Sequence, residues 1–160
     1  GLDTGLETCE KIIANLKAGY PRLALWQEAV KRQVRACRYS ETWLGRRRYL
    51  PNIVSEDWGK KSFAERCAMN TPIQGTAADI VKLAMARIVA ELPDYPWVCP
   101  VLTVHDSLVF YVPKDRVMEA GRLMKGLMEK QPFPEFDVPL VAEVAAGKNY
   151  GELADMEVEL

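Results

Sequence analysis

Apolar residues recur with a helical period over the first part of the chain. Residues 6–18 and 21–38 place apolar side chains three or four positions apart, with Lys, Arg and Glu between them. This spacing predicts two amphipathic helices. Gly19 and Pro21 separate them, and proline is well accommodated in the first turn of a helix. The predicted apolar face of the second helix is Leu23, Trp26, Val30 and Val34.

The pattern changes twice before residue 92. Residues 41–54 read as a short strand, a turn at Gly45 and a second strand. Residues 58–91 then return to a helical pattern that contains Pro72. A proline inside a helix removes one hydrogen bond and clashes with the preceding turn, so we expect a kink or a break into two helices there.

The last part of the chain predicts a strand-rich fold. A proline-rich loop at residues 93–100 leads into two β-prone runs, 101–104 and 108–112, which are apolar at nearly every position, so we expect both of their faces to be covered. Residues 114–130 predict an amphipathic helix, and residues 138–144 predict a final strand. Helices followed by a hairpin, a helix and a strand indicate an α+β fold with an incomplete antiparallel sheet.

The turn between the two apolar runs holds His105, Asp106 and Ser107. Burying an ionised carboxylate is costly unless a partner or a metal compensates it. At the rim of a sheet, Asp106 could hold a divalent cation that also touches a substrate phosphate. An ordinary structural turn is the alternative, since Asp and Ser are common turn residues.

A polar stripe runs along the long predicted helix. Arg66, Asn70 and Gln74 are spaced four residues apart, so on a continuous α-helix they share one face with a drift of about 40° per step. All three side chains donate hydrogen bonds, and the minor groove of DNA presents acceptors at similar places in every base pair. A row of donors would therefore sense base-pair shape without reading sequence. A solvated polar face is the alternative.

Three consecutive arginines follow the predicted turn. Arg46, Arg47 and Arg48 come directly after Gly45, where each can pair with a phosphate. A solvated loop explains the charge equally well.

Composition bounds the class of protein. The net charge of −1 hides an asymmetry, because residues 1–66 hold 13 Lys/Arg against 8 Asp/Glu and residues 67–160 hold 8 against 14. A basic half suits contact with a polyanion. No apolar run approaches the ~20 residues of a membrane span, and no secretory signal is apparent, so we expect a cytoplasmic protein, or a viral one acting in the host cytoplasm, with no membrane contact.

The four cysteines form no Cys-x-x-Cys pair: Cys9, Cys37, Cys67 and Cys99.

Three blocks of the sequence resemble DNA polymerases of family A, the DNA polymerase I type. They are residues 42–53 with the Gly-Arg-Arg-Arg turn, residues 65–85 with Arg-x3-Asn-x3-Gln and Gln-Gly-Thr-Ala-Ala-Asp, and residues 103–110 with Val-His-Asp. The third block is similar to the motif C hairpin of the family. Residues 137–150 resemble its closing strand and tail.

The resemblance implies a role for each matching residue. Asp106 would be the motif C carboxylate that binds the catalytic metals, and His105 would lie near the primer terminus. Arg66, Asn70 and Gln74 would contact the minor groove. Arg46, Arg47 and Arg48 would lie near the nucleic-acid backbone.

The resemblance also implies how the chain is organised and what it acts with. Residues 1–92 would be partial fingers with the long helices, and residues 93–160 partial palm, in one fragment. The implied reaction is template-directed DNA synthesis by a two-metal mechanism with Mg²⁺, on primer-template DNA and dNTP.

Two departures from the family pattern bear on activity. Ser107 stands where motif C usually has Glu, so it brings no second charge and could act only through a water. The motif A strand and the nucleotide-binding fingers helix are absent from the 160 residues. We therefore expect this chain alone to be inactive. Three origins fit: one half of a split polymerase with a separate N-terminal half, a fragment of a longer polymerase, or a remnant gene. A non-catalytic nucleic-acid-binding remnant of a polymerase scaffold is the alternative.

Overall fold

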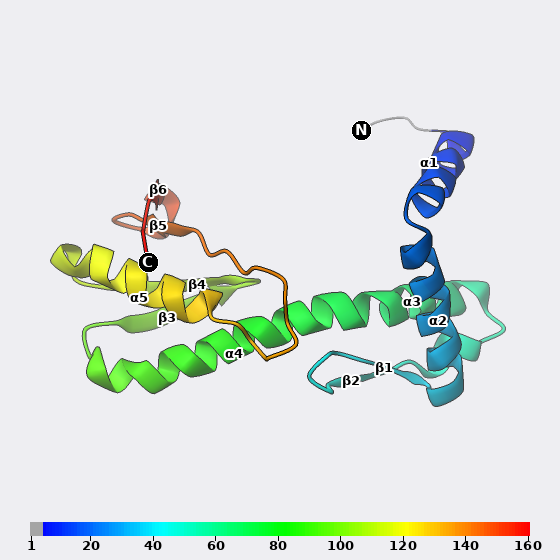
Figure 1. Cartoon of the computed structure of the whole chain (residues 1–160), viewed down its shortest axis with the longest axis horizontal. Coiled ribbons are helices and arrows are strands. Elements are labelled where there is room, and N and C mark those ends of the chain that lie inside the picture. Colours follow the sequence, from blue (N-terminus) through cyan, green and yellow to red (C-terminus); the bar gives the residue numbers. More distant parts are fainter. Residues whose placement is uncertain (1–4) are drawn as a thin grey trace. The chain divides into compact units, whose positions relative to one another are not determined.

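The computed structural model describes residues 5–160, which form two compact units that divide between Thr76 and Ala77. Figure 1 shows the order of their helices and strands. Helices combined with short antiparallel strand pairs make the fold α+β, as the sequence predicts. The boundary between the fingers-like and palm-like parts, at residues 92 and 93, stays a prediction.

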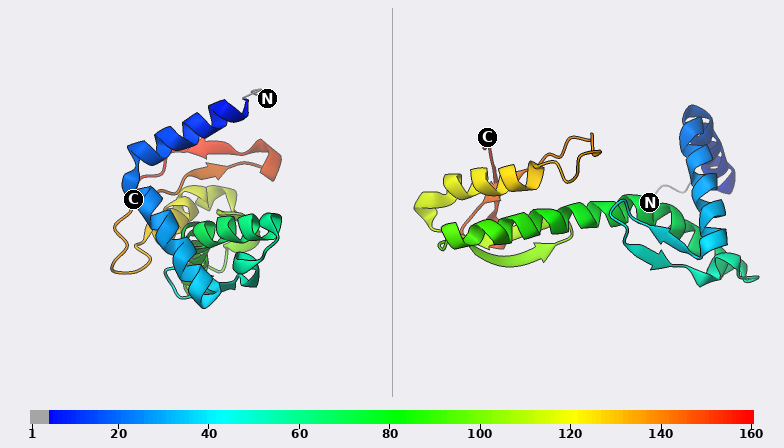
Figure 2. Two further views of the ribbon diagram at one scale, coloured as in Figure 1. Left: turned by 90° about the vertical axis from the view of Figure 1, so that its right-hand side faces the viewer. Right: turned by 60° about the horizontal axis from the view of Figure 1, so that its bottom comes forward.

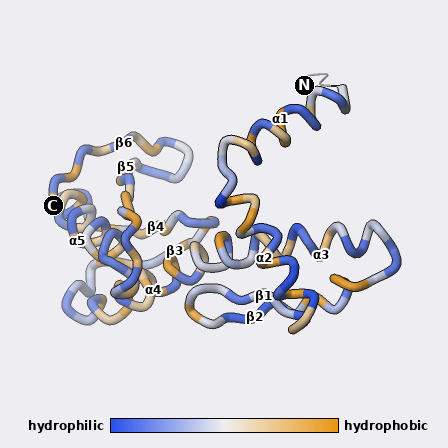
Figure 3. The backbone as a smooth tube through the Cα atoms, turned by 45° about the vertical axis from the view of Figure 1, so that its right-hand side comes forward, coloured by the Kyte–Doolittle hydropathy of each residue, from blue (hydrophilic) through white to orange (hydrophobic). Residues whose placement is uncertain are grey.

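The first unit begins with the two predicted helices, α1 (Leu6–Gly19) and α2 (Pro21–Cys37). The chain bends between them at Tyr20 (Figure 2). Val34 of α2 is buried, whereas Ile13 and Leu16 of α1 are each 51% exposed. The hydropathy tube in Figure 3 shows apolar positions among the polar ones along α1.

The predicted hairpin follows as β1 (Tyr39–Glu41) and β2 (Arg47–Tyr49), which pair antiparallel. Gly45 in the turn has a φ of 84°, a left-handed conformation that favours glycine. The 3₁₀ turn η1 (Pro51–Val54) then leads to α3 (Trp58–Asn70), which Asp57 caps. The core of this unit is a cluster from α2, η1, α3 and the residue directly after β2: Val34, Leu50, Ile53, Ala64, Cys67 and Ala68.

Pro72 has a milder effect than the predicted kink or break. Residues Thr71–Gly75 form a π-helical turn, η2, and the next helix begins directly at Thr76. A wider turn accommodates the missing N–H of Pro72 without ending the helical path. The uniform drift expected for residues four apart on an α-helix therefore does not apply between Asn70 and Gln74.

The second unit is built around α4 (Thr76–Glu91) and the hairpin β3 (Cys99–Val104) and β4 (Ser107–Tyr111), joined by η3 (Leu92–Asp94). After η4 (Lys114–Arg116), helix α5 (Val117–Glu129) brings Met124 into one apolar cluster with Ile88 and Val98. The predicted hairpin and amphipathic helix are both present.

The expectation that both faces of this hairpin are covered is wrong. Every residue of β3 is exposed, with Leu102 51% and Val101 46% accessible, while Leu108 and Phe110 of β4 pack against the apolar cluster. The physical reason is that the sheet has only two strands in the described part of the chain. Its apolar side chains are those of a covered strand, but no described strand or helix lies over them.

The predicted last strand at residues 138–144 is also misplaced. The chain is irregular up to Glu143, and β5 (Val144–Ala146) pairs with β6 (Ala154–Met156) across the 3₁₀ turn η5 (Tyr150–Glu152), away from the β3–β4 ladder. Hydrogen bonds hold the irregular segment instead: Lys125 donates to the Ala142 carbonyl at 2.8 Å, and Ala142 N–H donates to Glu129 at 2.8 Å. Val138 and Val141 are 59% and 80% exposed, so the apolar residues of this segment do not form a covered strand. Side chains of α5 hold its backbone instead.

Candidate nucleic-acid interface

A buried hydrogen bond joins the β1–β2 hairpin to the helix that follows it. Pro72 has no N–H to donate to the carbonyl of Ala68, four residues earlier. The hydroxyl of Ser40, on β1, donates to that same oxygen at 2.8 Å. Since Ser40 is only 3% exposed, the bond satisfies an acceptor that water cannot easily reach.

Two further contacts fix the hairpin at the π-helical turn. The N–H of Trp43 donates to the hydroxyl of Thr76 at 3.0 Å, and that hydroxyl donates to the Pro72 carbonyl at 2.6 Å. Gly75 lies so close to Thr42 that a Cβ at position 75 would be 2.6 Å from the Thr42 methyl. The hairpin and the turn therefore pack backbone against side chain, with room for glycine only.

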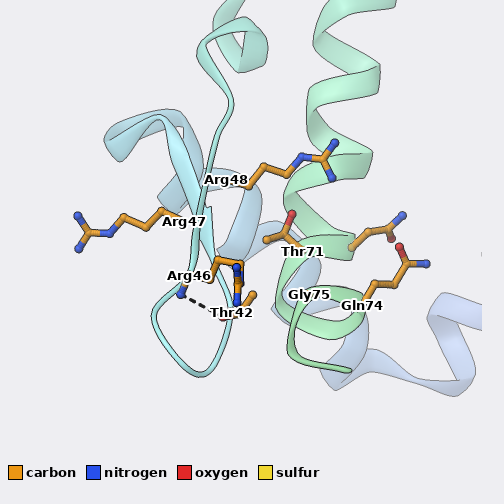
Figure 4. Close-up of a pocket in the computed structure, with 8 residues that line it drawn as sticks. Thr42, Arg46, Arg47, Arg48, Thr71, Gln74 and Gly75 are labelled. Carbon is orange, nitrogen blue, oxygen red and sulfur yellow. Dashed lines mark hydrogen bonds between the residues drawn. The ribbon is translucent and has the colours of Figure 1, made fainter. Parts of the chain in front are cut away.

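Strand alternation separates the arginines of the hairpin. Register pairs Ser40 with Arg48 and Glu41 with Arg47, so Arg48 shares the face of the buried Ser40, and Arg47 is on the opposite face. Figure 4 shows the Arg48 side chain directed toward the helix and the Arg47 side chain directed away from it. Of the pair, only Arg48 can reach the helical residues.

The hairpin and the helix enclose a shallow hollow of about 170 Å³, which we call the basic notch. Its lining residues come from the hairpin, the end of α3 and η2: Thr42, Arg46, Arg47, Arg48, Asn70, Thr71, Gln74 and Gly75. Pockets that enclose a small ligand are about 300 Å³ or larger, so the notch suits contact with an edge or a backbone rather than enclosure of a nucleotide. Two polar features that are separate in the sequence, the arginine turn and the polar stripe, thus meet at one site.

Arg66, the first member of the predicted stripe, is not part of the notch. Its guanidinium donates to the Ser62 hydroxyl at 2.9 Å and lies 5.9 Å from the centre of the Phe63 ring. Asn70 and Gln74 are exposed at the notch. Five of the six predicted nucleic-acid contacts therefore line the notch, although the Arg47 side chain is directed away from the helix.

The charges of the notch are unequal. The Nε of Arg47 donates to Glu41 at 2.7 Å, which raises the pKa of Arg47, and its guanidinium lies 4.5 Å from the centre of the Tyr39 ring. Among the described residues, Arg48 has no ion pair or hydrogen bond of its side chain. Arg48 is therefore the arginine of β2 whose charge a carboxylate does not offset.

Thr42, Thr71 and Gly75 also line the notch but were not among the predicted site residues. Their placement depends on hairpin register and on the π-helical turn, which local composition does not reveal. Gly75 next to the polar stripe was the available signal, since a glycine inside a helical pattern often marks a close approach.

The predicted catalytic turn lies entirely within the second unit. His105 and Asp106 are the two central residues of the β3–β4 turn, and Val104 pairs with Ser107 across it. His105 has a φ of 55°, a conformation that two-residue hairpin turns require and that a non-glycine residue adopts at some cost. All three turn residues are exposed, so Asp106 is presented at the tip.

The donor set at this turn does not make a complete Mg²⁺ site. Mg²⁺ prefers octahedral oxygen ligands and is usually bound through one or two carboxylates with substrate phosphates and waters. The turn offers one carboxylate, one imidazole and one hydroxyl, and residues 5–160 contain no cluster of three or more His, Cys, Asp or Glu side chains suited to a metal.

None of the helices in the described part combines the length and hydropathy that crossing a lipid bilayer requires.

Comparisons with known proteins agree with the three sequence blocks. The chain is 39% identical over 148 residues to the thermostable DNA polymerase I of Thermus filiformis. The match covers 89% of this chain and 17% of that protein. It is 42% identical over 113 residues to DNA polymerase I of Bacillus subtilis, covering 70% of this chain and 13% of that protein. The DNA polymerase of Bacillus phage SP01 is 34% identical over 168 residues, and the match covers 99% of this chain and 18% of that protein.

A solved structure has the same fold. The POL domain of Pol1 from M. smegmatis, in complex with DNA primer-template and dNTP, superposes with a TM-score of 0.77 at 34% identity, over 87% of this chain and 24% of that one. The chain thus spans less than a fifth of the curated relatives described above. The family profile of DNA polymerase family A matches residues 2–152, and the chain belongs to that family.

Proposed function

We propose that this chain supplies duplex-binding contacts and one metal-binding carboxylate for template-directed DNA synthesis, as one portion of a family A DNA polymerase. The observation that carries the proposal is the basic notch, where Arg48 meets the amides of Asn70 and Gln74. Its substrates are primer-template DNA and dNTP, and it acts together with a further polymerase portion.

The chemistry of the notch fits a DNA duplex. Primary amides donate to the acceptors that every base pair presents in the minor groove, so Asn70 and Gln74 report base-pair geometry without selecting a sequence. Arg48 supplies a cation for the neighbouring phosphates. A template-directed enzyme requires this combination, because it accepts any correctly paired sequence. Arg66 extends the contact only if its guanidinium leaves Ser62.

The turn at His105 contributes to the same function through Asp106. Polymerases of this family depend on metal ions in general, and Mg²⁺ supplies charge stabilisation for nucleotidyl transfer. Because the described donors do not complete a Mg²⁺ site, we assign Asp106 as one ligand and place the others on the further polymerase portion. Ser107 supports the metal site only through a water molecule. The two-metal mechanism is part of this proposal. We expect no primer extension by the 160-residue chain alone.

The lone carboxylate of the turn also favours a second candidate, a nucleic-acid-binding protein that has lost catalysis. In this candidate the notch has the same role, and the only difference is that Asp106 has no catalytic role. Duplex binding alone therefore does not separate the two, and substitution of Asp106 does.

The salt dependence of duplex affinity tests the role of the notch. Replacing Arg48 with Ala should lower the magnitude of the slope of log K against log salt by about 0.9, since one phosphate contact is lost. Asn70→Ala and Gln74→Ala should weaken binding with the slope unchanged, because neither side chain carries charge. Arg122→Ala, which removes an exposed arginine of α5, is the matched control and should change neither quantity. Fluorescence anisotropy with a blunt duplex measures all four variants. A reduced slope for Asn70→Ala or Gln74→Ala, or unchanged affinity, would contradict the assignment.

A further inference from the structure

The outer face of the β1–β2 hairpin carries an aromatic surface that shares only Arg47 with the lining of the notch. Tyr39 and Tyr49 are cross-strand partners on this face, with ring centres 5.9 Å apart in an edge-to-face arrangement. Glu41 and Arg47 are the next pair along the same face. We call these four residues the aromatic face.

This face is held in place by its own contacts. Arg47 lies diagonally across from Tyr39, with its guanidinium carbon 4.5 Å from the ring centre, and its Nε is bonded to Glu41. The guanidinium is therefore stacked on one side, with its orientation fixed by a carboxylate. Tyr49 is 70% exposed, so most of its surface is open to a further contact.

The charge of the aromatic face distinguishes what can bind it. Glu41 and Arg47 offset one another, so the face does not attract phosphates, whereas Arg48 on the other side of the same strand does. Planar, uncharged groups that arrive with a polyanion match this division. Nucleobases stack on tyrosine rings and on guanidinium planes, and their phosphates pair with nearby arginines.

We propose that the aromatic face binds unpaired nucleobases of a single-stranded extension of the duplex held at the notch, with Tyr49 as the principal stacking residue. The inference rests on the proposed function, because the continuity of the face with the notch on one hairpin brings the strand to it. The competing interpretation is that the two tyrosines only stabilise the hairpin.

The test compares a blunt duplex with the same duplex carrying a 5′ extension of thymidines. Fluorescence anisotropy with the full 160-residue chain gives both affinities. We expect the extension to tighten binding about tenfold, as expected for stacking of a base on an aromatic side chain. Tyr49→Phe keeps the ring and should keep this gain. Tyr49→Leu and Tyr49→Thr lose the ring and should lose the gain, while their affinity for the blunt duplex stays that of the unsubstituted chain.

The outcomes separate the two proposals. If the extension gives no gain, or if Tyr49→Leu and Tyr49→Thr retain it, the stacking surface is wrong, even when Asn70→Ala still weakens binding of the blunt duplex. If Asn70→Ala and Gln74→Ala leave blunt-duplex affinity unchanged, the proposed role of the notch is wrong. Thermal unfolding of each variant completes the test, since a purely structural role predicts loss of stability together with equal loss of affinity for both DNAs.

Discussion

Gly75→Ala should weaken duplex binding by at least tenfold and destabilise the first unit by about 1–3 kcal/mol, the usual range for overpacking a filled site. The added Cβ would lie 2.6 Å from the Thr42 methyl, and Thr42 is buried, so it has little freedom to move. Relief of this clash requires the hairpin to separate from η2, which opens the notch. Urea unfolding and anisotropy with a blunt duplex measure the two effects.

A second substitution shows whether this clash is the cause. Thr42→Ser removes the methyl but keeps the hydroxyl that accepts from Arg46 N–H at 3.1 Å. The next atom that a Cβ at position 75 would meet is the Thr71 methyl at 3.7 Å, an ordinary contact. Gly75→Ala combined with Thr42→Ser should therefore recover most of the stability and affinity. Equal damage in the single and double variants would show that the close approach is not what places the hairpin.

Asp106→Asn should lower the rate of nucleotidyl transfer by about 10³-fold, the scale of losing one group that stabilises transition-state charge, once the chain acts with a polymerase portion that supplies the other metal ligands. The substitution keeps the size of the side chain and removes its charge at the tip of an exposed turn, so the fold and duplex affinity should not change. Primer extension with Mg²⁺ in the reconstituted enzyme is the measurement.

Asp115→Asn is the matched control, because Asp115 is an exposed carboxylate of the same unit, in η4, and has no role in the proposed site. It should extend primers like the unsubstituted chain. Full activity of Asp106→Asn would favour the non-catalytic interpretation of this scaffold. Extension by the 160-residue chain alone would show that it does not need the further portion.

Local sequence patterns predicted which helices and strands form better than they predicted which of these elements pack or pair together. The helical period of residues 6–18 and 114–130 gave helices at nearly those bounds, because an amphipathic period depends on residues close in sequence. The apolar run at residues 101–104 correctly indicated a strand, but its exposure depends on which other strands are present. Pairing of β5 with β6 likewise depends on partners distant in sequence, and the run at residues 138–144 carried no information about them.

The same distinction applies to the candidate site. Spacing placed Asn70 and Gln74 on one helix, and composition singled out Arg46, Arg47 and Arg48, but nothing local indicated that the two groups line one hollow. Strand register decides that Arg48 points to the helix and Arg47 away from it. Pro72 was correctly identified as a disturbance, but Ser40, which bonds to the carbonyl that Pro72 leaves without a donor, lies 28 residues from Ala68.

The most direct test of the central claim observes the two amides of the notch while DNA is added. In NMR spectra of the chain titrated with a blunt duplex, the side-chain NH₂ resonances of Asn70 and Gln74 should shift progressively as the complex forms. Those of Asn149, which caps η5, and Gln131, which is bonded to the Pro134 and Phe136 carbonyls, should stay in place. Selective movement of Asn70 and Gln74 is the result that the account predicts. Stationary resonances for both residues in a complex that is shown to form would contradict it.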